Sequence, residues 1–268
     1  MKKVGLSLLI FSWVNLLLGQ SPYQFSLRQE LAWLIPSHGL IGTTTFLTTR
    51  LDPLSEMEIL QLDARDIGNF DRAATENYSE AAATRSDVLI FGSYALAAGA
   101  GAYAVAKQDN KGKQFLQLAL LGWETNAVTF AGTDLVKIGV GRIRPFVYNP
   151  DAPLEAKQEA NAQKSFFSGH TSITAANCFF LAKVLSDYFP EKKWTRWVWV
   201  GAALLPAWTA RERVAAGKHF PTDVIAGYTW GALCGFFVPH LHKKSLGKNL
   251  RISPVAGSVH GLSLRLTF

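Results

Sequence analysis

The chain has 268 residues, which is enough for one good-sized domain. Hydrophobic residues make up 49% of it, and its mean hydropathy of +0.11 is high for a soluble enzyme and low for a chain built only of membrane spans. The net charge of +7 suits an anionic lipid or a phosphate-bearing substrate. Nucleic acid is the weakest partner class, because no long run of Lys and Arg is interleaved with aromatic residues.

The first 20 residues are typical of a secretory signal. Lys2 and Lys3 precede an apolar run over residues 4–18, and small or polar residues follow at 19–21. We therefore expect residues 1–20 to be a signal peptide, with an uncleaved anchor as the alternative. Export places the protein in the cell envelope, either in the inner membrane with its site on the periplasmic side, or in the periplasm.

Residues 21–87 form a second region, which we expect to be a polar, acidic, extracytoplasmic segment. Nine acidic residues and three arginines lie between residues 52 and 87. The apolar stretch 31–49 is interrupted by Pro36, His38 and Gly39, and its proline and histidine suit an interfacial or packed helix better than a membrane span.

Residues 88–242 hold a series of apolar segments that predict an all-α helical bundle. Residues 88–106 carry no charge over a length close to that of a membrane span. The remaining segments lie at 115–136, 171–189, 197–210 and 224–241. Basic clusters follow the first, third and last segments, so in a membrane those loops face the cytoplasm and the loops 137–170 and 211–223 face the other side. The rival hypothesis is a soluble periplasmic protein whose apolar helices form its core.

The last region, residues 243–268, has a different pattern. Leu262, Leu264, Leu266 and Phe268 alternate with polar residues, as in a β-strand. Residues 252–257 are a candidate hairpin partner, so we expect a short C-terminal β-ribbon.

Three clusters of polar residues carry the chemistry, and all fall in loops on one side of the predicted bundle. Lys137, Arg144 and Arg213 offer fixed positive charge for phosphate oxygens. Ser168 and Gly169 precede a predicted helix, whose N-terminus favours anions. Two histidines complete the set. His219 has Asp223 four residues later to support it as a nucleophile, and His170, without such a local partner, suits the role of general acid.

These clusters resemble the type 2 phosphatidic acid phosphatase and haloperoxidase superfamily. Its pattern is Lys-x6-Arg-Pro, then Pro-Ser-Gly-His, then Ser-Arg-x5-His-x3-Asp. This chain matches the charged and nucleophilic positions but has Phe167 in place of the proline and Glu212 in place of the first serine of the last motif. The resemblance covers about residues 85 to 241.

The resemblance implies a mechanism. In the family, the histidine that matches His219 attacks phosphorus and forms a phosphohistidine, and the aspartate that matches Asp223 supports it. The histidine that matches His170 protonates the leaving group. The phosphate-binding positions are Lys137, Arg144, Ser168, Gly169 and Arg213. No metal and no cofactor are required. The expected function is hydrolysis of a phosphate monoester or diphosphate, of the phosphatidic acid or polyprenyl diphosphate type.

Three alternatives stay open at this stage. The chain could be a soluble periplasmic non-specific acid phosphatase, or a haloperoxidase that binds vanadate on the same residues. It could also be a catalytically silent envelope protein that binds an anion without turnover, since Glu212 brings a negative charge close to the site. His240 and His242 form a possible metal pair, but beside Lys243 and Lys244 we interpret them as a basic interfacial flank.

Overall fold

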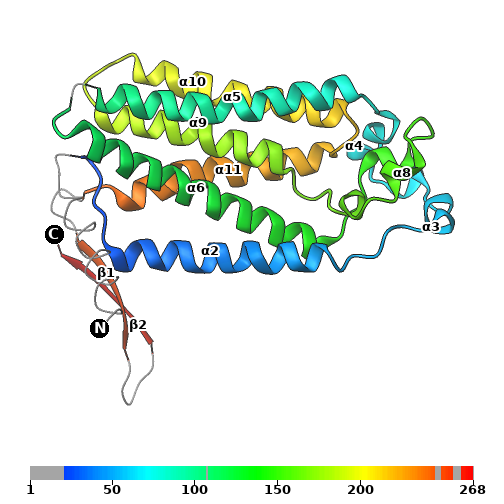
Figure 1. Cartoon of the computed structure of the whole chain (residues 1–268), viewed down its shortest axis with the longest axis horizontal. Coiled ribbons are helices and arrows are strands. Elements are labelled where there is room, and N and C mark those ends of the chain that lie inside the picture. The colour runs from blue at the N-terminus through cyan, green and yellow to red at the C-terminus, as the bar shows by residue number, and fades with distance from the viewer. Residues whose placement is uncertain (1–20, 107, 245–248, 256–260, 268) are drawn as a thin grey trace, which may run out of the picture.

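The computed structural model describes residues 21–106, 108–244, 249–255 and 261–267. The expected signal peptide at residues 1–20 therefore lies outside the described residues. Six long helices lie side by side along one axis (Figure 1): α2 (Leu27–Thr48), α5 (Glu80–Val105), α6 (Lys111–Val140), α9 (Gly169–Tyr188), α10 (Thr195–Ala215) and α11 (Pro221–His242). The prediction of an all-α helical bundle is confirmed.

Short helical turns cover one end of this bundle. They are α3 (Glu56–Leu60), η1 (Ala64–Asp66), α4 (Asn69–Arg72), η2 (Ala73–Glu76), α7 (Pro145–Tyr148), α8 (Leu154–Lys157) and η3 (Ala160–Gln163). The two strands β1 (Asn249–Val255) and β2 (Gly261–Thr267) pair antiparallel at the other end, with Ile252 opposite Leu264 (Figure 1). The chain thus has the short C-terminal ribbon that the alternation of residues predicted.

The central helix is α9, which α5, α6, α10 and α11 all contact. Its sequence allows this position because small residues recur on its faces and on those of its partner α11. A Cβ atom added to Gly231 would lie 1.9 Å from the carbonyl oxygen of Ser172, and one on Gly227 would lie 2.6 Å from that of Ser168. Glycines on α11 therefore let the two backbones touch, and this contact fixes the start of α9, where Ser168 lies.

We predict that Gly231→Ala destabilises the protein by about 3 kcal/mol, because the new methyl group overlaps the backbone of α9. Gly201 in α10 is the matched control. It has open space around it, so Gly201→Ala in an exposed helix position is expected to leave stability unchanged or to raise it by up to about 1 kcal/mol. Thermal unfolding in detergent compares the two variants, and equal midpoints would contradict this account of the α9–α11 contact.

The stretch 31–49, which was expected to be an interfacial or packed helix, lies almost entirely within the N-terminal helix α2. It is continuous through Pro36 and Gly39 and lies along α6 (Figure 1). Near its start, the Gln24 amide donates to the carbonyl of His242, and near its end Lys164 donates to the hydroxyl of Thr48. The helix α2 runs from one end of the bundle to the other. The loops 49–79, 141–168 and 216–220, which follow α2, α6 and α10, therefore lie together at the end covered by the short helices. This arrangement does not depend on whether residues 1–20 are a signal peptide.

The boundary expected between residues 87 and 88 falls inside α5. This helix begins at Glu80, where the Ser79 hydroxyl accepts from the amide of Ala82. The first two turns of α5 carry Arg85 and Asp87 and lack the hydrophobicity of the rest, which explains why composition alone placed the boundary too late. The acidic segment is thus continuous with the bundle.

Compared with a typical soluble protein, the bundle exposes more large apolar side chains on its outside and buries more polar side chains inside. Large apolar side chains are exposed on its outer helices, among them Phe91, Trp123, Trp197, Leu204 and Ile225. The inner faces of α6 and α9 instead bury polar side chains such as Thr125, Thr129, Asn177 and Lys183. Among the described helices, α5 and α11 are long and apolar enough to cross a membrane by length and composition.

Candidate active site

The structure brings all eight site residues predicted from the sequence to the end of the bundle covered by the short helices. Lys137 lies in the last turn of α6, Ser168 caps the start of α9, Gly169 and His170 are its first residues, and Arg213 lies in the last turn of α10. Arg144 immediately precedes α7, His219 lies in the loop between α10 and α11, and Asp223 lies in the first turn of α11. A Cβ atom on Gly169 would lie 3.8 Å from Cε of Lys137, which shows how closely the first two clusters meet.

Three buried cations in this cluster have no carboxylate partner among the described residues. Lys137 donates to the carbonyl of Lys164 at 2.7 Å, and Arg144 donates to the backbone and side-chain oxygens of Asn161 at 2.8 and 2.9 Å. Arg213 donates to the Ser86 hydroxyl at 3.0 Å, while its Nε has no hydrogen-bond partner. Unpaired charge is costly to bury, so the arrangement favours an anion at their centre.

The imidazole of His219 is fully enclosed and its orientation is fixed by a backbone group. Its Nδ1 lies 2.8 Å from the carbonyl oxygen of Ser165, which accepts the ring proton. This hydrogen bond leaves Nε2 with the free electron pair that a nucleophile needs. Asp223 lies 3.6 Å from Nδ1, beyond hydrogen-bond distance, so the Ser165 carbonyl orients the ring more directly than Asp223 does.

Asp223 instead holds the surrounding loops together. Its Oδ2 accepts from the Phe220 amide at 2.9 Å and from the Ser165 hydroxyl at 2.5 Å. Its Oδ1 accepts from Arg142 at 2.5 Å. Through these contacts Asp223 positions both the loop that carries His219 and the carbonyl that orients its ring.

Glycine 217 fixes the same loop on its other side. Its φ of +68° lies in the left-handed region, and a Cβ atom there would lie 2.0 Å from the carbonyl oxygen of Asn77. Its own carbonyl accepts from the amide of Phe146 at 2.9 Å. The His219 loop is therefore locked between the segment before α5 and α7.

His170 has a partner that local sequence did not reveal. Its Nε2 lies 2.8 Å from Oδ1 of Asp87, which α5 brings across the start of α9. A carboxylate at this distance can hold the imidazole in place and stabilise its protonated form. Asp87 is exposed to solvent, so this histidine faces the open side of the site.

Both histidines have lowered pKa values in the phosphate-free protein. Burial, together with the positive charges of Arg144, Lys137 and Arg213, holds the pKa of His219 well below its usual value. Burial and Arg213 lower the pKa of His170 to about 4, although Asp87 opposes this shift. A phosphate dianion placed among the same cations would offset their charge and raise both pKa values.

We predict that the phosphate-free protein loses stability as the pH falls from about 6.5 towards 5.5. The unfolded histidines titrate near pH 6.5 while the folded ones stay neutral, so the unfolded state takes up the protons first. Thermal unfolding midpoints at pH 7.5, 6.5 and 5.5 test this. His219→Gln should show a shallower fall than the wild type, and equal slopes would contradict the lowered pKa of His219.

Arg142 is the main residue of the site that the sequence did not single out. It bridges Asp223 and Asp71, with distances of 2.5 and 2.8 Å, and its guanidinium lies 3.9 Å from the centre of the Phe220 ring. Asp71 in turn accepts from the amide and hydroxyl of Thr222. Its place between Lys137 and Arg144 was the available signal, but its partner Asp71 lies 71 residues away.

We predict that Arg142→Gln destabilises the protein by about 3 kcal/mol, because it leaves the buried carboxylates of Asp71 and Asp223 without their cation. Arg65→Gln is the control. Its ion pair with Asp63 is solvent-exposed, so its loss should cost less than about 1 kcal/mol. Urea or thermal unfolding in detergent measures both. An Arg142 variant as stable as the Arg65 variant would exclude this bridge as an important contact.

The two departures from the family pattern contact residues outside the cation cluster. The Glu212 carboxylate pairs with Arg85 and Arg211, both at 2.8 Å, and accepts from the indole of Trp208. Its charge is therefore balanced on the side of α10 facing α5, which corrects the expectation that it sits beside the phosphate. Phe167 is buried and packs near Trp230 of α11.

Residues 118–246 match the family model of the PAP2 superfamily. All three clusters lie within this range, in the geometry just described. This part of the chain, just under half of its length, is thus similar to the PAP2 superfamily. The resemblance inferred from the three motifs is thus confirmed.

Two curated relatives show what the PAP2 region is similar to. It is 32% identical over 142 residues to a lipid A 1-phosphatase of Rhizobium johnstonii, a match that covers 50% of this chain and 53% of the relative. It is 29% identical over 124 residues to a lipid A 4'-phosphatase of Bacteroides thetaiotaomicron, covering 46% and 52%. The chain thus spans about half the length of these relatives.

The comparison with solved structures includes a match to the transmembrane PAP2-type phosphatidylglycerolphosphate phosphatase of Bacillus subtilis. The two chains superpose with a TM-score of 0.48 at 20% sequence identity, and the match covers 76% of this chain and 94% of that one.

Proposed function

We propose that this protein is a phosphatase that hydrolyses a phosphate monoester or diphosphate of a lipid through a phosphohistidine on His219. The observation that carries the proposal is a group of three buried cations around a buried imidazole, Lys137, Arg144 and Arg213, which have no carboxylate partner in the described part of the chain. Such preorganised charge stabilises the oxygens of a transferring phosphoryl group. The first turn of α9 adds the Ser168 hydroxyl and the N–H of Gly169 as further donors.

In the proposed first step, Nε2 of His219 attacks phosphorus and the bond from phosphorus to the leaving oxygen breaks. His170 gives its proton to that oxygen, so the leaving group departs as a neutral alcohol or as a protonated phosphate. In the second step, His170 takes a proton from water, the water oxygen bonds to phosphorus, and the P–N bond breaks. Inorganic phosphate and the original histidines result. No metal takes part in either step.

The proposed mechanism requires His170 to be protonated and His219 to be neutral. The lowered pKa of His219 favours its neutral form. The lowered pKa of His170, about 4 in the phosphate-free protein, does not favour protonation by itself. Bound phosphate and the Asp87 carboxylate both act to raise it, so we assign the competent state to the substrate complex.

A lipid substrate is supported by the exterior of the bundle. Its exposed apolar side chains and buried polar ones suit an apolar solvent. A cavity of about 320 Å³ between α5, α6 and α9 is lined largely by apolar residues, including Tyr94, Trp123 and Phe180. It begins about 10 Å along α5 from Asp87, so an acyl chain could occupy it while the phosphate reaches the cations. The relatives named as lipid A phosphatases agree with this class.

We further propose that the bundle is embedded in the inner membrane with its site on the periplasmic side. The site loops share one end, and the basic loops after α5, α9 and α11 lie at the other, the arrangement that the positive-inside rule predicts. The alternative of a silent anion-binding protein loses its main support, because Arg85 and Arg211 neutralise Glu212.

The test is phosphate release by the detergent-solubilised protein from lipid A, phosphatidic acid, a polyprenyl diphosphate and p-nitrophenyl phosphate, with and without EDTA. We expect release from at least one lipid at a kcat/KM at least tenfold above that for p-nitrophenyl phosphate, with inhibition by vanadate. Preference for p-nitrophenyl phosphate would contradict the lipid assignment. No release from any of the four by a folded protein would contradict the proposed phosphatase.

A further inference from the structure

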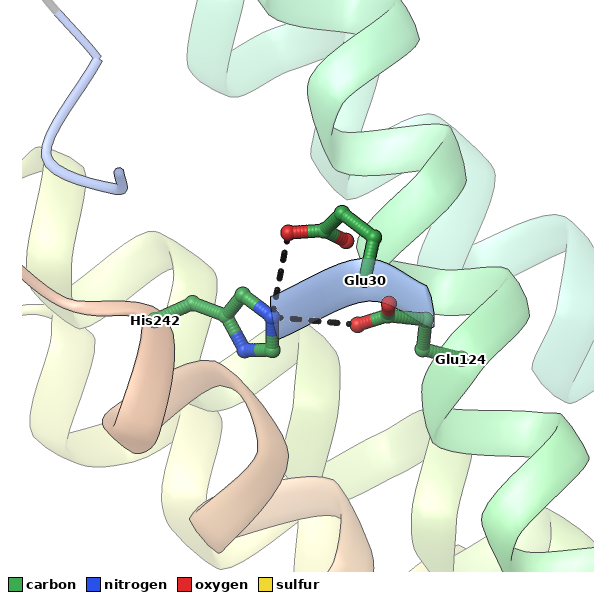
Figure 2. Close-up of side chains that lie close together, drawn as sticks. All are labelled: Glu30, Glu124 and His242. Carbon is green, nitrogen blue, oxygen red and sulfur yellow. Dashed lines mark ion pairs between the residues drawn. The ribbon is translucent and has the colours of Figure 1, made fainter. Parts of the chain in front are cut away.

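A second cluster of ionisable side chains lies far from the phosphate site, near the end of the bundle that carries the ribbon. It consists of Glu30 from α2, Glu124 from α6 and His242 from α11, and Figure 2 shows all three side chains pointing toward one another. Nε2 of His242 lies 3.1 Å from Oε2 of Glu124 and 3.6 Å from Oε1 of Glu30. The proposed phosphatase mechanism uses none of these residues.

The two carboxylates of this cluster are buried without adequate partners. The side chains of Glu124 and His242 are 0% exposed and that of Glu30 is 10% exposed. Apart from these approaches to Nε2 of His242, the four carboxylate oxygens have no hydrogen-bond partner within the described part of the chain. Even a protonated His242 supplies one positive charge for two carboxylates, and a buried anion without compensation is strongly unfavourable.

The ion pairs of two lysines at this end of the bundle do not include the two glutamates. Lys183 near the end of α9 and Lys243 after α11 both pair with Asp187 instead. These two lysines therefore balance the charge of Asp187 and not that of the two glutamates.

The orientation of the His242 ring favours a metal ion as the missing cation. Nδ1 of the ring lies 2.8 Å from the carbonyl oxygen of Val238, which accepts its proton and directs the electron pair on Nε2 toward the carboxylates. A second-shell hydrogen bond of this kind to a backbone carbonyl is typical of histidines that bind metals.

The spacing of the donor atoms fits a small divalent metal. Zinc bonds of about 2.0–2.2 Å at tetrahedral angles place neighbouring ligand atoms roughly 3.3–3.5 Å apart. The distances of 3.1 and 3.6 Å from Nε2 to the two carboxylates lie on either side of this value, and all three donor atoms lie within 4.8 Å of one another. One imidazole with two carboxylates suits Zn²⁺ or a similar first-row metal ion.

We propose that Glu30, Glu124 and His242 bind one Zn²⁺-type divalent metal ion, with water as the fourth ligand, and that this ion ties α2 to α6 and α11. The site is structural and separate from the phosphate site. The sequence-based interpretation of His240 and His242 as one basic flank thus holds only for His240, which is exposed, whereas His242 turns into the bundle.

The test uses the full-length protein without a histidine tag, stripped with EDTA in detergent and dialysed. Titration with Zn²⁺ by calorimetry and metal analysis should give one bound equivalent, and Co²⁺ should give the intense visible absorption of a tetrahedral site. Zn²⁺ should also raise the thermal unfolding midpoint of the stripped protein.

Matched variants locate the bound ion. Glu124→Gln and His242→Gln should lose the equivalent, whereas His240→Gln, two residues away and exposed, should retain it. Glu30→Gln, at the rim of the cluster, should weaken binding at least tenfold. Less than 0.1 equivalent on the wild type would overturn the proposal and leave a proton shared within the cluster. Equal binding by wild type and Glu124→Gln would also overturn it. If a variant does not fold, the wild-type titration alone decides.

Discussion

Replacing His219 with alanine is expected to lower kcat by about 10³-fold or more, because the variant loses the atom that forms the covalent intermediate. Alanine also removes the hydrogen bond to the Ser165 carbonyl, but the loop stays held by Asp223, Gly217 and their partners. We therefore expect the far-ultraviolet circular dichroism and the elution volume in detergent to match those of the wild type. Phosphate release from the best lipid substrate measures the loss.

His38 provides the control for this variant. It lies on α2, stacks on Trp123 and contacts none of the site residues described above. His38→Ala should retain wild-type turnover within a factor of about two. If His219→Ala kept more than a tenth of the wild-type kcat, another group would have to be the nucleophile.

Replacing Arg213 with methionine is expected to reduce kcat/KM by about 10²–10³-fold and, at the same time, to raise the stability of the phosphate-free protein. The guanidinium is one of the preorganised charges that the transferring phosphoryl group requires. In the absence of phosphate it is a buried cation that is repelled by the charges of Arg144 and Lys137 and has the Ser86 hydroxyl as its hydrogen-bond partner. Relief of this repulsion should raise the unfolding midpoint by roughly 2–4 °C.

Arg196→Met is the matched control, because Arg196 is exposed at the opposite end of the same helix and stacks on Trp197. Its kcat/KM should not change. A fall in both activity and stability of Arg213→Met would mean that Arg213 is mainly a structural residue, and the proposed anion site would lose one of its three cations.

The sequence predicted the parts of the structure that depend on local pattern. Apolar segments predicted all six long helices, alternation in residues 262–268 predicted the second strand, and motif spacing placed Lys137, His170 and His219 together. Helix ends were less accurate. The first turns of α5 and α6 are polar, so hydrophobicity alone could not detect them, and α2 continues through Pro36 because packing on α6 outweighs the cost of a helix proline.

What local pattern could not predict are partners that only the fold brings together. Asp71 reaches Arg142 from 71 residues away, Asp87 reaches His170 from 83, and Arg85 neutralises Glu212 from 127. Each pair changes the electrostatic environment that the sequence alone suggested for one of its residues. His170 gains a carboxylate partner, and Glu212 ceases to oppose anion binding. The same reason hid the cluster of Glu30, Glu124 and His242, whose members belong to three different helices.

The central claim is the covalent bond between phosphorus and His219, and rapid-quench trapping tests it most directly. Wild-type protein and His170→Ala are mixed with a phosphate-labelled lipid substrate, quenched in base, digested and analysed by mass spectrometry. We predict a base-stable, acid-labile phosphate on the peptide containing His219, with longer-lived label in His170→Ala because its hydrolysis is slow. Label on another residue, or product release with no label at any time, would contradict the mechanism.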